Sequence, residues 1–342
     1  MPTLVTVARA GQGKVAHFPD VVRLPDGRLL ATYREGAGHL SRDGRICTAS
    51  SEDGGATWAP PRVAVDGPYD DRDPKLAITR DGTLLLSYFI IDWGTEPRHT
   101  PLGTYVRRSV DGGDSWAEPV PVESVMAGVG GRTADGYALG WACSHGAAVE
   151  LPDGDLLLPL YGTVADDRWQ RATVVRSTDG GRTWPVAGEV PVAAAADVHF
   201  QEPTLTVLPD GQVVALIRTT VEHAYLSRST DGGRSWSAPA PTDMPASSHH
   251  ALLLGTGEVL VTYGDTSERF SPRRETVGRL VRDPAGPWDG YADVQLYDSG
   301  HDDQANPSSV EVAPGRLLTV SFDVTEGTVV GVFTGVNDYP LV

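Results

Sequence analysis

The chain has 342 residues, of which 40% are hydrophobic, and its formal net charge is −17. This negative surface excludes a protein that binds nucleic acid through phosphate contacts, because such contacts need clustered Lys and Arg. No apolar run reaches 18 residues, so we expect neither a membrane-spanning helix nor a membrane partner.

The N-terminal residues 1–7 lack the basic stretch and the apolar stretch of a secretory leader, which favours a cytoplasmic location. The only cysteines, Cys47 and Cys143, form neither a disulfide framework nor a zinc-binding spacing. The sequence also has no glycine-rich phosphate loop and no His/Asp spacing typical of a metal site. We therefore expect no cofactor and no metal ion.

One hairpin pattern recurs six times along the chain: an apolar stretch, a two-residue turn ending in Gly, and a second apolar stretch. Asp-Gly between hydrophobic runs favours a hairpin, and we expect type I′ turns because Gly accepts a positive φ. The glycines are 46 (211 to 257) to 72 (82 to 154) residues apart, enough for four short strands each. Six such units predict an all-β fold, a single six-bladed β-propeller domain over residues 1–342. The turns are Asp26-Gly27, Asp81-Gly82, Asp153-Gly154, Asp210-Gly211, Thr256-Gly257 and Pro314-Gly315.

A second repeat, Ser-x-Asp-Gly-Gly-x-Thr/Ser-Trp, is interleaved with the hairpins. Its four copies end at Trp58, Trp116, Trp184 and Trp236, and a degenerate fifth copy ends at Trp288. The Asp can accept hydrogen bonds from turn N–H groups and the Trp can fill an apolar space, so these Asp boxes predict fold rather than catalysis. We expect their tryptophans to be largely buried and far from the ligand pocket.

Asp boxes combined with six such hairpins resemble the sialidase (neuraminidase) superfamily of BNR-repeat proteins, over about residues 11–333. The resemblance implies a six-bladed, sialidase-like propeller that hydrolyses a glycosidic bond.

Polar residues recur at one register position, nine residues before the hairpin Gly, in five of the six units. A proline follows four of the six, and proline is accepted where a strand begins. Equivalent points in a propeller surround the axis at one end, so these residues predict a polar binding pocket there. The six are Phe18, Asp73, His145, Glu202, Ser248 and Asn306.

Two arginines, Arg34 and Arg218, stand seven residues after their hairpin glycines, beside that ring in the paired strand. Paired carboxylates suit acid/base work at a glycosidic bond, and guanidinium groups suit an acidic substrate. We expect the catalytic residues to be Asp73, Glu202, His145 and His249. We expect the substrate-binding residues to be Arg34, Arg218, Glu35, His39, His17, Asn306 and His250.

The resemblance implies roles for three of these residues. Asp73 before Pro74 is similar to the sialidase acid/base, Glu202 to the glutamate that tunes a nucleophilic tyrosine, and Arg218 to an arginine of the substrate-binding triad.

Two departures mark a divergent member. The sialidase Arg-Ile-Pro motif is replaced by His17-Phe18-Pro19, which removes one triad arginine. The segment Asn306-Pro307-Ser308-Ser309 lacks the nucleophilic tyrosine. Arg273, Arg274 and Arg279 are all candidates for the third triad arginine.

Three functions fit these patterns. The first is a divergent glycoside hydrolase whose partner is a carbohydrate or another small molecule, expected to be anionic. The second is a polysaccharide lyase, or another acid–base enzyme, in which an Arg neutralises a uronate and a His moves the proton. The third is a carbohydrate-binding propeller without catalysis.

Overall fold

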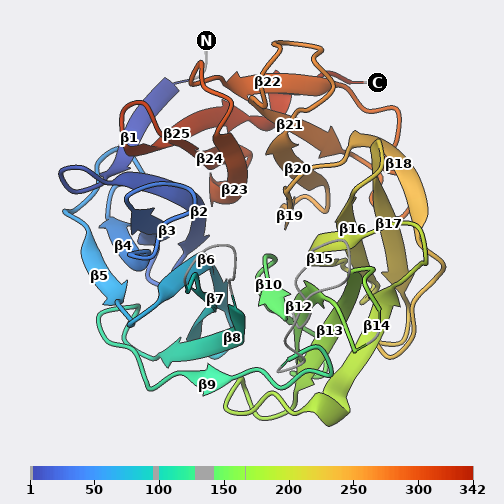
Figure 1. Cartoon of the computed structure of the whole chain (residues 1–342). Coiled ribbons are helices and arrows are strands. Elements are labelled where there is room, and N and C mark those ends of the chain that lie inside the picture. Colours follow the sequence, from blue (N-terminus) through green and yellow to red (C-terminus); the bar gives the residue numbers. More distant parts are fainter. Residues whose placement is uncertain (1–2, 95–99, 128–141, 166, 342) are drawn as a thin grey trace.

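The fold is a ring of six antiparallel sheets around a central axis, as the computed structural model in Figure 1 shows. The structure describes residues 3–94, 100–127, 142–165 and 167–341. The predicted six-bladed β-propeller is confirmed, and each blade contains one of the six hairpin turns. In the described parts of the chain, no helix has the length and apolarity that crossing a membrane requires.

The blades follow one another along the chain. Blade 1 contains β2 (Val15–Arg23), β3 (Leu29–Gly36), β4 (Arg45–Ser51) and β5 (Arg62–Val65). Blade 2 contains β6 (Asp70–Ile78), β7 (Leu84–Asp92), β8 (Thr100–Ser109) and β9 (Val120–Pro121). Blade 3 contains β10 (Cys143–Ser144), β11 (Val149–Glu150), β12 (Leu156–Gly162), β13 (Arg171–Ser177) and β14 (Glu189–Ala193), with the 3₁₀ turn η1 (Val186–Gly188) before β14.

The remaining blades complete the ring. Blade 4 contains β15 (Phe200–Val207), β16 (Val213–Thr219), β17 (His223–Ser229) and β18 (Ala240–Pro245). Blade 5 contains β19 (His249–Leu253), β20 (Val259–Gly264), β21 (Thr276–Val281) and β22 (Asp293–Tyr297). Blade 6 contains β23 (Gln304–Ala313), β24 (Arg316–Asp323), β25 (Thr328–Gly335) and β1 (Thr3–Arg9), and the 3₁₀ turn η2 (Val336–Asp338) follows β25.

The ring is closed by the two ends of the chain. Strand β1 pairs antiparallel with β25, with Thr3 opposite Phe333, so the first and the last strand of the chain lie side by side in blade 6 (Figure 1). The hydrophobic core lies between neighbouring blades, where apolar side chains of adjacent sheets interdigitate.

The hairpin glycines have positive φ as expected, from 72° at Gly315 to 92° at Gly257. The expected type I′ geometry is wrong, however, because Asp26 is not among the residues with positive φ. The N–H of Gly27 instead donates to the carbonyl of Leu24, and the N–H of Leu24 donates to the carbonyl of Arg28. This is a type I turn followed by a glycine bulge, a three-residue hairpin loop.

The Asp boxes join the third and fourth strands of blades 1–4. In the first copy, Asp53 accepts hydrogen bonds from the N–H and the hydroxyl of Thr57, and Ser51 accepts one from the N–H of Gly55. Of the four tryptophans Trp184 is fully buried and Trp58, Trp116 and Trp236 are partly buried, which agrees with the expectation that they are largely buried. Each of these three packs against a hydrophobic core cluster.

Candidate active site

Four of the six ring positions have a strained backbone. Phe18, Asp73, Glu202 and Asn306 have φ between 47° and 54°, a region that costs a non-glycine residue about 1–3 kcal/mol. Each precedes a proline, and the pairing register shifts there: Arg72 lies opposite Phe89, but Lys75 lies opposite Ser87. Asp73 and Pro74 therefore lie opposite the single residue Tyr88. This β-bulge has one extra residue and reorients the side chain at its first position.

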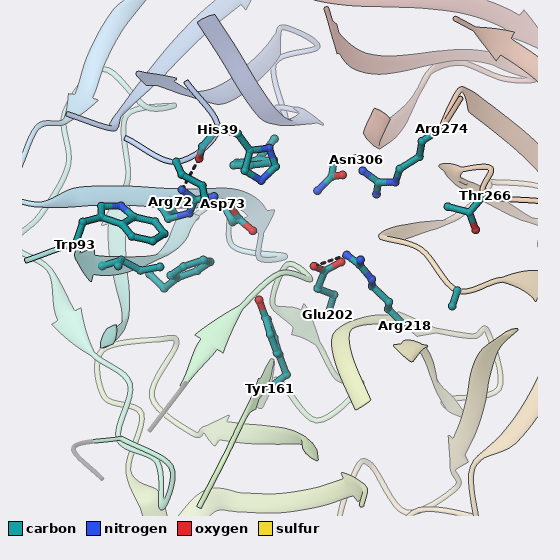
Figure 2. A pocket seen from close by; sticks show the side chains of 15 residues that line it. His39, Arg72, Asp73, Trp93, Tyr161, Glu202, Arg218, Thr266, Arg274 and Asn306 are labelled. Atoms are coloured by element: carbon teal, nitrogen blue, oxygen red, sulfur yellow. Dashed lines mark hydrogen bonds and ion pairs between the residues drawn. The ribbon is translucent and has the colours of Figure 1, made fainter. Parts of the chain in front are cut away.

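A pocket of about 350 Å³ opens at the axis, on the side of these bulges. All six blades contribute residues to the wall of this pocket, as expected for a pocket on the axis. Figure 2 shows the polar side chains converging on the pocket. The lining residues are Phe18, His39, Leu40, Arg72, Asp73, Phe89, Ile91, Trp93, Tyr161, Glu202, Arg218, Ala246, Thr266, Arg274 and Asn306.

Glu202 lies in a network with two arginines. Its Oε1 accepts a hydrogen bond from Arg218 Nη1 at 2.9 Å, and its Oε2 accepts one from the Ser248 hydroxyl. Ser248 in turn accepts one from Arg274 Nη2 at 3.1 Å. Burial alone would raise the pKa of Glu202. The charge of Arg218, together with His145, the Ser248 hydrogen bond and Arg274, outweighs burial and holds that pKa well below its usual range.

Asp73 is the second carboxylate of the pocket. Its Oδ2 lies 3.6 Å from Nδ1 of the buried His145, too far for a direct hydrogen bond but close enough for a charge interaction. Burial opposes ionisation, yet His145 and the charge of Arg72 lower the pKa of Asp73. Both pocket carboxylates are therefore anions at neutral pH.

Tyr161 brings a hydroxyl into the same space. It extends from β12 of blade 3, and Figure 2 shows its oxygen directed into the pocket between Asp73 and Glu202. Burial raises the pKa of Tyr161 well above its usual value, so this hydroxyl keeps its proton at neutral pH.

Arg72 places a positive charge on the opposite side of the pocket from Arg218, and two hydrogen bonds hold its guanidinium group. Its Nη1 donates to Asp70 Oδ2 at 2.9 Å and to the carbonyl of His39 at 2.8 Å. Its guanidinium lies 5.2 Å from the ring centroid of Phe18 and 5.7 Å from that of Trp93, distances that favour cation–π attraction.

The structure does not bring Arg34 or Glu35 to the pocket, which corrects the expectation that they bind substrate. Arg34 is fully buried, and its Nε donates to Asp70 at 2.7 Å. Glu35 accepts hydrogen bonds from Arg45 and from the N–H of Gly11. Arg34 thus connects blade 1 to blade 2, and Glu35 connects β3 to β4 and to the segment that contains Gly11.

Among the histidines that the structure describes, only His39 lines the pocket, and His145 lies 3.6 Å from the pocket carboxylate of Asp73. His249 packs on Tyr263 at 4.9 Å between ring centroids, and burial lowers its pKa to about 3. His250 accepts a hydrogen bond from the N–H of Ser309. These contacts do not support the expected catalytic role of His249 or a binding role of His250.

His17 is buried behind Phe18 and does not line the pocket. Its Nε2 lies 3.1 Å from Asp303 Oδ2, and Nδ1 of His39 lies 2.9 Å from Oδ1 of the same carboxylate. Within the described residues, this trio is the group of His, Cys, Asp and Glu side chains close enough together to hold a metal ion.

Several lining residues were not predicted as functional. Arg72 and Trp93 were missed. Arg72 directly precedes Asp73 at a bulge, and because the alternation of side-chain directions breaks down there, the strand pattern did not place Arg72 in the pocket. Tyr161 stands seven residues after its hairpin Gly, as Arg218 does, and this spacing could have identified it. Of the three candidate arginines, Arg274 lines the pocket, whereas Arg273 pairs with Asp298 and Arg279 with Asp293.

Comparison with known proteins finds two sialidases and one protein of unknown function that are similar to this chain. A sialidase of Micromonospora viridifaciens is 27% identical over 69% of this chain, and the match spans 38% of that sialidase. A protein of unknown function from Dyadobacter fermentans has a solved structure with a TM-score of 0.82 and 25% identity, covering 97% of this chain and 99% of that one. The Hadza microbial sialidase Hz136 has a TM-score of 0.73 and 19% identity, covering 95% of this chain and 66% of its own.

The family model described as "BNR repeat-like domain" matches residues 27–317. This match covers most of the propeller, including all four complete Asp boxes. The chain therefore belongs to the BNR repeat-like domain family and is a sialidase-like member of it.

Proposed function

We propose that this protein is a divergent sialidase-like glycoside hydrolase that cleaves a glycoside of an acidic sugar. The observation that carries the proposal is the presence of two ionised carboxylates, Asp73 and Glu202, in one axial pocket with three arginines. The sialidases among the relatives support this reaction class.

The charge of the pocket favours an anionic substrate. Among the described lining residues, three guanidinium groups (Arg72, Arg218 and Arg274) face two carboxylates. Burial lowers the pKa of Arg274 only to about 10, so it remains a cation at neutral pH. A carboxylate on the sugar would complement the excess positive charge.

Asp73 is the proposed general acid/base. It is ionised in the free protein and must take up a proton before it can protonate a leaving group. An anionic sugar bound beside it, together with the expulsion of water, raises the pKa of a carboxyl group and favours that uptake. His145, 3.6 Å away, is placed to exchange the proton.

Glu202 is the proposed partner carboxylate, and it remains an anion because of Arg218. The Tyr161 hydroxyl is the nucleophile that the pocket offers, since phenol groups can form covalent intermediates. Tyr161 would attack the anomeric carbon as Glu202 receives its proton. The aglycone would leave with the proton of Asp73. Water would then attack the anomeric carbon and give a proton to Asp73, the Tyr161–sugar bond would break, and Glu202 would return its proton to the Tyr161 oxygen.

The proposal is tested with fluorogenic glycosides that share one aglycone and differ in the sugar. N-acetylneuraminic acid and glucuronic acid represent acidic sugars, and galactose is the neutral control. The expected result is release of the fluorophore from an acidic glycoside. The galactoside should be turned over at least about 10-fold more slowly, because galactose has no carboxylate to contact the arginines of the pocket. No release from any acidic glycoside at millimolar concentration would contradict this substrate class.

A parallel assay with an oligosaccharide of O4-linked uronates separates hydrolysis from elimination. A hydrolase releases a saturated sugar, whereas a lyase acting on a uronate leaves an unsaturated product that absorbs ultraviolet light. Appearance of this absorbance would replace the hydrolase proposal with the lyase. Binding measured by calorimetry without turnover would instead support a carbohydrate-binding propeller.

A further inference from the structure

We propose that His17, His39 and Asp303 form a binding site for a divalent transition-metal ion at the rim of the axial pocket. The three residues come from separate parts of the chain: strand β2, the loop between β3 and β4, and the loop between β22 and β23. Two imidazoles and one carboxylate are ligands that suit Zn²⁺ and related ions, whereas Mg²⁺ and Ca²⁺ prefer oxygen ligands alone.

The donor atoms have the separations that one ion requires. His17 Nε2 lies 3.1 Å from Asp303 Oδ2, and His39 Nδ1 lies 2.9 Å from Asp303 Oδ1. One donor atom from each residue lies within 4.8 Å of the other two. Donors bound to Zn²⁺ at about 2.1 Å are at most about 4.2 Å apart, so an ion needs only a small approach of the side chains.

The imidazoles are held in place by packed aromatic rings. The His17 ring lies 5.2 Å from that of Phe18 and 5.1 Å from that of Phe322, and the His39 ring meets Phe18 edge-on at 5.1 Å, all between centroids. Such an apolar shell fixes ligand orientation and limits access of water to a metal site.

The charges of Arg34 and Arg72, which lie near His17 and His39, do not prevent binding of an ion. Arg34 donates to one oxygen of the Asp70 carboxylate, and Arg72 donates to the other. Their positive charge is therefore partly compensated beside the proposed site, and Asp303 supplies the negative charge directed at the metal.

The site adjoins the axial pocket, because His39 belongs to both. With three protein ligands, a four-coordinate Zn²⁺ keeps one position for water or a ligand. On the side of His39, this position would be open to an oxygen of a molecule bound in the pocket. No spacing of ligands along the chain indicated this site, because Asp303 follows His39 by 264 positions.

The test is calorimetric titration of the full chain, freed of any affinity tag and treated with a chelator, with Zn²⁺ alone. The wild type should bind one Zn²⁺ per chain, and His39→Ala and Asp303→Asn should each weaken binding by at least about 10-fold. His17 is fully buried, so the variants are made at the two more exposed ligands. The matched control is His223→Ala, since His223 lies 3.7 Å from Glu222 on another blade without a second imidazole.

Cobalt provides a second readout, because Co²⁺ bound in a Zn²⁺ site absorbs visible light. This absorbance should appear in the wild type and in His223→Ala and be lost in His39→Ala. Equal Zn²⁺ affinity of wild type and both ligand variants, or no specific binding by the wild type, would overturn the proposal. These measurements use no substrate, so their outcome is independent of the proposed hydrolysis.

Discussion

Arg218 holds Glu202 through a 2.9 Å hydrogen-bonded ion pair between Nη1 and Oε1, made across neighbouring strands of blade 4. The register places Gln201 opposite Arg218, and the bulge at Glu202 brings the next side chain back to the same guanidinium. The ion pair therefore forms at a strained backbone position, Glu202, and it favours the ionised form of this carboxylate.

The first prediction concerns this charge state and acid stability. The native pKa of Glu202 lies below the value of about 4.3 expected in the unfolded chain. The ionised carboxylate therefore stabilises the fold above about pH 4.3, and this contribution is lost as the pH falls below that value. Glu202→Gln should melt at a lower temperature than the wild type at pH 7, and the difference should shrink between pH 5 and pH 3.

Thermal melting across this pH range checks the prediction. Glu222→Gln is the control, because the Glu222 side chain is exposed and makes only a 3.7 Å contact with His223. A gap between wild type and Glu202→Gln that stays constant down to pH 3 would show that Glu202 is not held ionised by the fold.

The second prediction concerns Gly146, next to His145 in blade 3. A Cβ at this position would lie 2.4 Å from the carbonyl oxygen of Pro203 and 2.9 Å from Thr204 Cα, both backbone atoms of blade 4. Gly146→Ala should push the bulge that carries Glu202 out of place and reduce turnover at least about 10-fold, since small misplacements of catalytic groups are costly.

Gly255→Ala is the matched control, because its added Cβ makes only an ordinary contact with Glu311. Initial rates and melting temperatures of both variants should be measured together. If Gly146→Ala retained the wild-type rate, close packing of blade 3 on blade 4 would not position Glu202.

The third prediction concerns the Asp-box tryptophans. Trp184 is fully buried in the core between blades 2 and 3, whereas Trp58 is half-buried. Trp184→Ala should lower the free energy of unfolding by about 3–5 kcal/mol, as in other large-to-small core substitutions, and Trp58→Ala should lower it less. Denaturant titration measures both values, and equal losses would contradict the difference in burial.

The fold was predictable because its signals are local. Hairpin glycines and Asp boxes specify turns within a few residues, and their spacing gives the number of blades. The type of hairpin turn was not predictable in this way, because an Asp-Gly pair fits both the type I′ turn and the type I turn with a glycine bulge.

The site was predictable where a local signal marks it. The position before a proline, which was expected to begin a strand, identified Asp73, Glu202 and Asn306, which all reach the pocket. In the structure each lies at a bulge within its strand. Arg34 and Arg218 share one register position but differ in their neighbours. Arg34 meets Asp70 of the next blade, a contact between distant residues that no local pattern contains.

The pair of pocket carboxylates is the centre of the proposed mechanism, and the most direct measurement is the turnover of an acidic glycoside by Asp73→Asn and Glu202→Gln. Each variant should be at least about 100-fold slower than the wild type, a typical contribution of general acid–base catalysis. Asp73→Asn should keep the circular dichroism spectrum of the wild type, because Asp73 faces the pocket. Glu35→Gln, which alters a buried carboxylate outside the pocket, should remain active once its stability is matched by temperature. Wild-type rates in Asp73→Asn and Glu202→Gln would contradict the account.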